Sequence, residues 1–143
     1  MCEILAVSSG GGHWQQLQLL SKAFDGKKVV YACSSDVGDA SIIRLPDCNM
    51  RTPWRLIITA IAAWKLVRQI NPDTVVSTGA APGVLVLITA KLHRRRTVWV
   101  DSIANTERMS LSGRLARSFS DLWVTQWPQV SHRSGAVYLG AII

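Results

Sequence analysis

Residues 4–13 read ILAVSSGGGH, and this stretch decides the fold. The apolar run at 4–7 is unbroken, which is typical of a strand covered on both faces, as in a parallel sheet. Three glycines follow it, and helical spacing of apolar residues begins at His13. A strand, a glycine-rich turn and a helix in this order predict the start of a βαβ unit with its turn at the carboxyl end of the strand.

The same alternation continues along the chain. Further strand-length apolar runs lie at 29–33, 42–45, 74–76, 98–100, 122–124 and 136–139, and stretches with helical spacing lie at 13–24, 53–70, 82–93 and 111–119. We therefore predict an α/β fold, a Rossmann-like parallel sheet with helices on both faces. At 143 residues and 48% apolar composition, the chain is expected to form a single domain over 1–143.

Ligands of such sheets bind beyond the carboxyl ends of the strands. This rule selects the loops at 8–13, 34–39, 77–83 and 101–112, which are also the loops richest in Gly, Ser, Thr and Asp. The glycines at 10–12 predict either a close approach of backbone amides to an anion or only a tight turn. His13 is a candidate general base at the mouth of this loop, or a helix residue that bonds to its own loop.

Several kinds of site are disfavoured by missing motifs. Gln15 stands where the dinucleotide fingerprint needs its third glycine, although Asp36 could serve as the ribose-binding acid of a nicotinamide-dependent oxidoreductase, which stays an alternative. The sequence has no phosphate-loop signature, no DxD and no GxSxG, and its three cysteines lack CxxC spacing. We expect no metal site and no cofactor.

The net charge of +7 is unevenly distributed, because residues 51–143 carry twelve Lys and Arg against four Asp and Glu. Such a basic surface attracts phosphate-rich partners, so a nucleic-acid-binding module is a second alternative, with Arg94–Arg96 as its contacts. The six tryptophans lie mostly in apolar segments, however, and no nucleic-acid-binding fold signature is present. We therefore expect no nucleic acid partner.

The predicted helix at 53–70 is amphipathic. Its apolar stripe comprises Leu56, Ile57, Ala60, Ala63, Trp64, Val67 and Ile70, and its opposite side comprises Arg55, Thr59, Lys65, Arg68 and Gln69. The apolar run is too short to cross a bilayer, which needs ~20 residues. The helix therefore either packs on the sheet or docks at a membrane surface, and the expected membrane-facing residues are Trp54, Arg55, Trp64, Lys65 and Arg68.

Four segments together carry a family resemblance. They are SGGGH at 9–13, DTVVSTGAAPG at 73–83, VDSIANTERMSLSGRLARSFSDLWVTQWP at 100–128 and VYLG at 137–140. The chain resembles bacterial exopolysaccharide and capsule subunits of the PssD type, which are similar to the membrane-recruiting subunit of the eukaryotic dolichol-linked UDP-GlcNAc transferase. More distantly it resembles the N-terminal domain of the lipid II-forming transferase MurG.

This resemblance implies the acceptor-binding N-terminal half of a GT-B glycosyltransferase. It implies His13 as the catalytic residue, and it places the lipid diphosphate and the acceptor sugar against Gly10, Gly11, Gly12, Thr78, Gly79, Asn105 and Glu107. The implied reaction is inverting transfer of a hexosyl or glucuronosyl group from a UDP-sugar to a polyprenyl-diphosphate-linked saccharide. The implied pathway is exopolysaccharide or capsule synthesis.

The resemblance also implies a partner and a location. A separate C-terminal-half subunit would bind the UDP-sugar, and the chain alone would be inactive. The apolar residues at 138–139 and 141–143 would be covered by that partner, or would simply finish the last strand. Because residues 1–7 lack a basic lead and a long apolar stretch, we expect a cytoplasmic protein. The lipid-linked acceptor that the resemblance implies would place it peripherally on the inner face of the plasma membrane.

Overall fold

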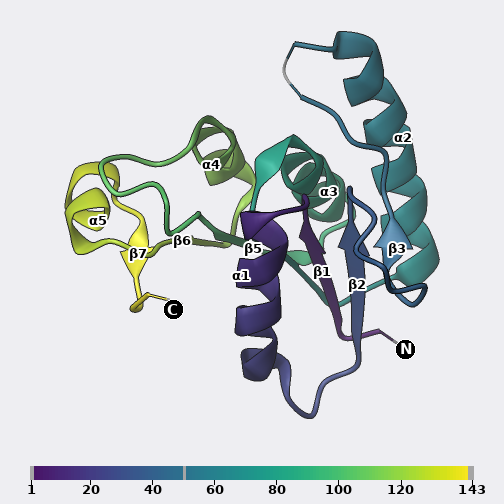
Figure 1. Ribbon diagram of the computed structural model, residues 1–143, viewed down its shortest axis with the longest axis horizontal. Helices are drawn as coiled ribbons and strands as arrows, with labels where there is room; N and C mark the ends of the chain where they lie inside the picture. Colours follow the sequence, from purple (N-terminus) through teal and green to yellow (C-terminus); the bar gives the residue numbers. More distant parts are fainter. Residues whose placement is uncertain (1, 50, 142–143) are drawn as a thin grey trace.

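A computed structural model describes residues 2–49 and 51–141 of the chain. Its strands form one seven-stranded sheet in the order β3-β2-β1-β4-β5-β6-β7, in which every neighbouring pair is parallel (Figure 1). The strands are β1 (Ile4–Ser8), β2 (Val29–Cys33), β3 (Ile43–Arg44), β4 (Thr74–Ser77), β5 (Arg96–Val100), β6 (Leu122–Thr125) and β7 (Val137–Tyr138). The predicted Rossmann-like sheet is thus confirmed.

Helical crossovers connect successive strands, except that a loop at 34–42 joins β2 to β3. The α-helices are α1 (Gly12–Leu20), α2 (Pro53–Ile70), α3 (Ala80–Leu92), α4 (Leu111–Ala116) and α5 (Pro128–Ser134). Short 3₁₀ turns extend α1 and α4 over Ser21–Phe24 and Arg117–Phe119, so the predicted helices at 13–24 and 111–119 each end in a tighter turn. Helix α5 was not predicted, although Pro128 at its first turn and Gly135 beyond its end are both recognised helix boundary signals.

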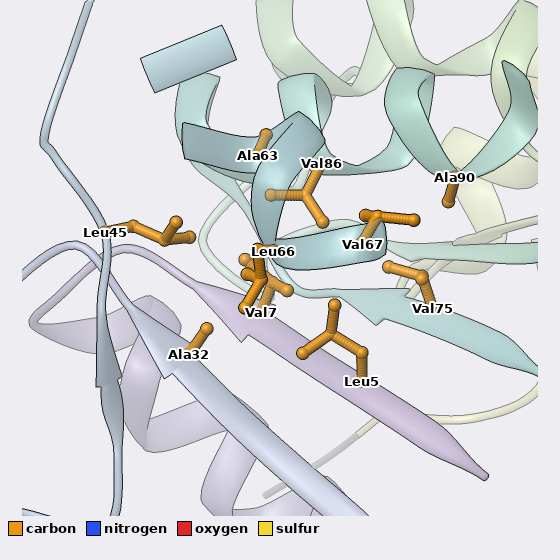
Figure 2. Packing of buried hydrophobic residues seen from close by; sticks show 10 residues of the cluster. All are labelled: Leu5, Val7, Ala32, Leu45, Ala63, Leu66, Val67, Val75, Val86 and Ala90. Carbon is orange, nitrogen blue, oxygen red and sulfur yellow. The ribbon is translucent and has the colours of Figure 1, made fainter. Parts of the chain in front are cut away.

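The central strands bury alternate residues on the two faces of the sheet. Leu5, Val7 and Val75 pack against α2 and α3, whereas Ala6 and Val76 lie on the other face with α1. Figure 2 shows the first of these clusters, in which side chains from β1, β2 and β4 meet Ala63, Leu66, Val67, Val86 and Ala90 of the two helices. Both faces are therefore covered at the centre of the sheet, as its continuous apolar runs require.

Helix α2 has the predicted bounds but a different orientation. Thr59, predicted on the polar side, is fully buried, and its hydroxyl donates to the Pro46 carbonyl oxygen at 3.1 Å. Ala63 and Val67 of the predicted apolar stripe are buried, whereas Ile57 and Trp64 of the same stripe are exposed. The predicted stripe is thus divided between the core and the surface, and only the assignment of Thr59 to the polar side was wrong. Apolar residues occur around most of this helix, so the sheet can accept a side that includes a small, hydrogen-bonded threonine.

None of the helices in the described part of the chain is both long enough and apolar enough to cross a membrane.

An apolar groove lies on the α1 side of the sheet, and Leu20 of α1 and Phe24 of the following turn form part of its lining. Val98, Val100, Leu122 and Val124 of β5 and β6 also line this groove of about 390 Å³, whose far wall is the segment at 139–141. We call this surface the sheet-face groove.

The apolar end at 141–143 was predicted to meet a partner; residues 142 and 143 lie outside the described residues.

Gly83 sets how closely α3 approaches β4. A Cβ atom at this position would lie 2.1 Å from the Ser77 hydroxyl oxygen. We predict that Gly83→Ala lowers the free energy of unfolding by about 1–2 kcal/mol, because overpacking outweighs the gain in helix propensity. Urea denaturation measures this change.

The control uses the contact itself. In a Ser77→Ala background the oxygen is gone, so Gly83→Ala should be neutral or stabilising by up to about 1 kcal/mol. An equal loss of stability in both backgrounds would contradict the assigned contact.

Candidate functional site

The candidate site lies at the carboxyl edge of the sheet, between β1 and β4. The chain passes from β1 outward to β2 and β3, and then returns through α2 to β4 on the other side of β1. The strand order therefore reverses between β1 and β4, which is where open α/β sheets bind ligands. The loops that follow these two strands carry the glycines at 10–12, His13, Thr78 and Gly79.

His13 and Thr78 hold the two loops together by reciprocal hydrogen bonds. His13 Nδ1 lies 3.1 Å from the Thr78 carbonyl oxygen, and Thr78 Oγ1 donates to the His13 carbonyl oxygen at 2.8 Å. Because a carbonyl oxygen only accepts, Nδ1 carries the proton in this bond. In the neutral imidazole, Nε2 then has the free lone pair that a general base requires.

Gly79 is shaped by its contact with that imidazole. Its φ is 155°, a conformation that favours glycine, and a Cβ atom here would lie 2.2 Å from His13 Nδ1. The next residue, Ala80, also has a positive φ, of 65°. The backbone is therefore bent tightly against the histidine ring, and a side chain at position 79 would displace the ring.

Two helices begin at this point without side-chain caps. The N-cap residues are Gly11 for α1 and Gly79 for α3, and no side chain bonds to the first amides of either helix. Helix N-termini with free amides carry a partial positive charge and favour anions. At Gly11 and Gly12 a Cβ atom would meet nothing within 4 Å, so this part of the loop is open. The arrangement suits a phosphate group lying on both helix ends.

Two buried hydroxyl groups lie along the same edge. Ser8 is the last residue of β1 and Ser34 directly follows β2, and both are almost fully buried. Among the described residues, their hydroxyl oxygens are the two buried side-chain polar atoms without a hydrogen-bond partner. Most buried hydroxyl groups in proteins are hydrogen-bonded. These two can therefore still donate or accept a hydrogen bond beside the glycine loop.

Asp101 organises the loop that follows β5. Its buried carboxylate accepts from Trp99 Nε1 at 3.1 Å and from Asn105 Nδ2 at 3.2 Å. It also accepts from the Ser110 hydroxyl at 2.6 Å and the Ser110 amide at 2.9 Å. Four donors therefore surround one carboxylate. Asp101 is a positioning residue for Asn105 and for the start of α4.

A pair of glutamines that the sequence did not single out connects this loop to α1. Gln16 Nε2 donates to the Ser102 hydroxyl at 3.1 Å, and Gln126 Nε2 donates to Gln16 Oε1 at 2.7 Å and to the Asp101 carbonyl oxygen at 2.9 Å. Both glutamines are buried. The one available signal was that Gln126 lies two residues beyond the strand predicted at 122–124, which places it at the carboxyl edge.

The structure brings some predicted site residues together and leaves others apart. His13, Thr78 and Gly79 are in contact, and Gly10 packs on the loop after β2, where its Cβ would lie 2.3 Å from the Ser35 hydroxyl oxygen. Asn105 is half-buried and held by Asp101. Glu107 is exposed, and the contact found for it is its backbone oxygen, which accepts from Arg133 at 3.0 Å.

Metal ligands are not grouped at this site. Within residues 2–49 and 51–141, no three His, Cys, Asp or Glu side chains lie close enough to hold a metal ion.

The predicted membrane-facing residues all lie on the exposed side of α2. Five large apolar side chains follow one another along this side at helical spacing and form what we call the outer ridge, Trp54, Ile57, Ile58, Ile61 and Trp64. Arg55, Lys65 and Arg68 are exposed beside it, and the Arg55 guanidinium lies 5.0 Å from the centre of the Trp54 ring. Helix α2 stands at one end of the molecule (Figure 1).

Solved structures share this fold at low sequence identity. MurG from Acinetobacter baumannii superposes with a TM-score of 0.73 at 12% identity, covering 91% of this chain and 42% of that chain. A structure of S. aureus MnaA with UDP gives 0.71 at 13% identity, covering 92% and 40%. At this level of identity the likeness shows the fold alone. It confirms the Rossmann-like half of a GT-B fold that the resemblance implied.

Relatives found by sequence similarity say more about the family of this chain than the solved structures do. The protein named UDP-N-acetylglucosamine transferase subunit ALG14 from Eremothecium gossypii is 36% identical over 104 residues, covering 66% of this chain and 46% of the relative. The mouse protein of that name is 34% identical (57% and 41% covered), and the human protein is 30% identical (71% and 52% covered).

The chain thus spans about half the length of the curated relatives it matches. The profile of the family described as "Oligosaccharide biosynthesis protein Alg14 like" matches residues 44–142, which is more than half of the chain. The predicted relation to the dolichol-linked transferase subunit is confirmed. The chain belongs to the Alg14-like family of oligosaccharide biosynthesis proteins.

Proposed function

We propose that this chain is the acceptor-binding subunit of a two-component inverting glycosyltransferase. The observation that carries the proposal is the His13 imidazole, fixed on the Thr78 carbonyl oxygen between two uncapped helix N-termini. A base beside an anion site is what transfer to a diphosphate-linked acceptor needs. The name of the relatives, UDP-N-acetylglucosamine transferase subunit, supports the same class of reaction.

In the proposed reaction, His13 Nε2 takes the proton from an acceptor hydroxyl group. The hydroxyl oxygen then attacks the anomeric carbon of the UDP-sugar and forms the new glycosidic bond. The bond between that carbon and the phosphate oxygen breaks, and UDP leaves with its electron pair. The hydrogen bond from Nδ1 to Thr78 stabilises the imidazolium that forms, because its acceptor is already in place.

The glycine loop and the start of α3 are proposed to hold the acceptor diphosphate. Gly10, Gly11 and Gly12 present the amides of α1, and Gly79 presents those of α3. Asn105, held by Asp101, and Glu107 are proposed to face the acceptor sugar. We infer a polyprenyl-diphosphate-linked saccharide of exopolysaccharide or capsule synthesis, and a hexosyl or glucuronosyl donor, from the resemblance carried by the segment at 100–128.

A separate subunit is proposed to supply the UDP-sugar. The relatives are themselves named as subunits, which supports an assembly of more than one chain. The sheet-face groove is a suitable contact surface, since its lining is mainly apolar and includes the exposed side chains of Leu122 and Leu139. Tyr138 and Leu139 are exposed apolar residues at the same end of the sheet and extend this surface.

The outer ridge of α2 is proposed to dock at the cytoplasmic surface of the plasma membrane. A lipid-linked acceptor requires the site to reach a bilayer. Trp54 and Trp64 suit the interfacial region, and Arg55, Lys65 and Arg68 suit anionic headgroups. The burial of Thr59 strengthens this proposal, because it turns the large apolar residues of α2 outward.

We expect transfer only from the assembled enzyme. The chain mixed with its partner should glycosylate a polyprenyl-diphosphate acceptor, whereas the chain alone should transfer no sugar and bind UDP-sugars weakly in calorimetry. Leu122→Asp and Leu139→Asp, both in the sheet-face groove, should raise the Kd of the assembly by at least about tenfold.

Leu92→Asp is the matched control for Leu139→Asp, since Leu92 is about as exposed as Leu139 and lies at the end of α3, outside the lining of the groove. It should leave the Kd of the assembly unchanged. Transfer by the isolated chain at the rate of the mixture would refute the two-component proposal.

For the assembled enzyme we predict that His13→Ala lowers kcat by about two to four powers of ten, because general base catalysis is lost. His132→Ala is the matched control, since His132 is exposed on α5. Circular dichroism checks that both variants fold. Unchanged turnover in His13→Ala would remove this residue from the mechanism.

Flotation with phosphatidylglycerol vesicles tests the membrane surface. The triple variant Arg55→Ala/Lys65→Ala/Arg68→Ala should reduce binding by at least about tenfold at low salt, since each cation near an anionic surface contributes about 1 kcal/mol. The triple variant Lys22→Ala/Lys27→Ala/Lys28→Ala removes the same charge from exposed positions elsewhere and should bind like the wild type. Equal loss in both variants would show a nonspecific charge effect and exclude α2 as the docking element.

A further inference from the structure

Four arginines surround a concave surface on the α4 and α5 side of the molecule. Arg108 comes from the loop after β5, Arg114 from α4, Arg117 from the turn that extends it and Arg133 from α5. Together with Met109 and Trp123 they line a cavity of about 400 Å³ that we call the arginine pocket. One loop and three helical elements between residues 108 and 133 thus bring four guanidinium groups to one cavity.

No carboxylate neutralises this cluster. Within residues 2–49 and 51–141 the single ion pair joins Lys91 to Asp121, outside the pocket. Arg117 lies over the Trp123 ring at 5.2 Å, and Arg133 donates to a backbone oxygen, that of Glu107. The four positive charges are therefore left without an acidic partner in the described structure, and an anion would offset their mutual repulsion.

The second basic cluster of the chain differs in this respect. This cluster lines a cavity at the amino ends of β4 and β5 and comprises Arg94, Arg95, Arg96 and Lys91. Two carboxylates, those of Asp73 and Asp121, line the same cavity. The Lys91 ammonium beside Asp121 lowers the pKa of that carboxyl group. The arginine run thus has its own counter-charges, whereas the arginine pocket has none.

We propose that the arginine pocket is a second anion-binding site, separate from the glycine loops, that takes a diphosphate group. Guanidinium groups bind phosphoryl oxygens in pairs of parallel hydrogen bonds, so several arginines around one cavity favour an anion with several such oxygens. Met109 and the half-buried Trp123 form an apolar floor, which suits the organic group attached to the diphosphate. The ligand is a nucleoside diphosphate or the diphosphate headgroup of a lipid.

Trp123 provides a local reporter for this site. Its indole Nε1 donates to the Gly113 carbonyl oxygen at 2.7 Å, so its N–H signal comes from a fixed geometry next to the arginines. Nuclear magnetic resonance of the full chain, with the indole signal assigned by Trp123→Phe, should show this signal shift when inorganic pyrophosphate is added. An unchanged signal at saturating pyrophosphate would overturn the proposal.

Calorimetry with inorganic pyrophosphate at low salt tests the residues. Arg114→Ala/Arg133→Ala should raise the Kd at the arginine pocket by at least about tenfold, since charge-assisted hydrogen bonds are lost. Arg94→Ala/Arg96→Ala is the matched control, because it removes the same charge from the other cluster, and should change the Kd by less than about twofold. Equal weakening in the two variants, or none in the first, would overturn the proposal.

Two further ligands identify the source of the diphosphate. If UDP displaces pyrophosphate from the arginine pocket, the ligand is a free nucleotide. If vesicles containing polyprenyl diphosphate bind the wild type and are released by Arg114→Ala/Arg133→Ala, the ligand is a lipid headgroup. If UDP does not displace pyrophosphate and the double variant does not release the vesicles, the diphosphate assignment is wrong.

This inference stands apart from the proposed glycosyl transfer. His13→Ala removes the proposed base and should leave the shift of the Trp123 signal intact. Failure of one proposal therefore does not carry over to the other.

Discussion

The reciprocal hydrogen bonds between His13 and Thr78 are the interaction on which the site depends. They join the loops after β1 and β4 where the strand order reverses, and so bring two helix N-termini together. They also select the imidazole tautomer that leaves Nε2 free. Gly79 is required by the same contact, because any side chain there would meet the ring. Fold, anion site and candidate base therefore share one small set of backbone contacts.

Helix α2 carries apolar residues on two sides, one in the core and one at the surface. Its inner side packs on the sheet through Ala63, Leu66 and Val67 (Figure 2). Thr59 on the same side donates a hydrogen bond to the Pro46 carbonyl oxygen. The small residues Thr59 and Ala63 are accommodated there beside Leu66 and Val67 because the sheet supplies the rest of the core. The large apolar residues are left for the outer ridge. A helix this apolar on two sides is consistent with one protein face and one interfacial face.

Much of this architecture could be predicted from local pattern. The bounds of β2 and α2 were predicted to the residue, and the loops at the carboxyl edge were identified, because strand and helix periods differ sharply. The burial of Thr59 could not be predicted, since an apolar majority around the helix leaves its rotation to tertiary packing. Nor could the role of Asp101, whose four donors come together only in the folded loop. His13 was identified as a candidate, but its partner lies 65 residues further on.

The sheet order also bears on how the chain folds as it is synthesised. Of the strands in this sheet, β1 is synthesised first, yet it is central in the finished sheet and must be flanked by β2 and by β4. Its edge toward β4 therefore stays unpaired until residues 74–77 have been made, after the whole of α2. An open edge on an apolar parallel strand is prone to pair with other chains. A nascent chain of this protein thus most needs protection from aggregation while the segment between β3 and β4 is being synthesised.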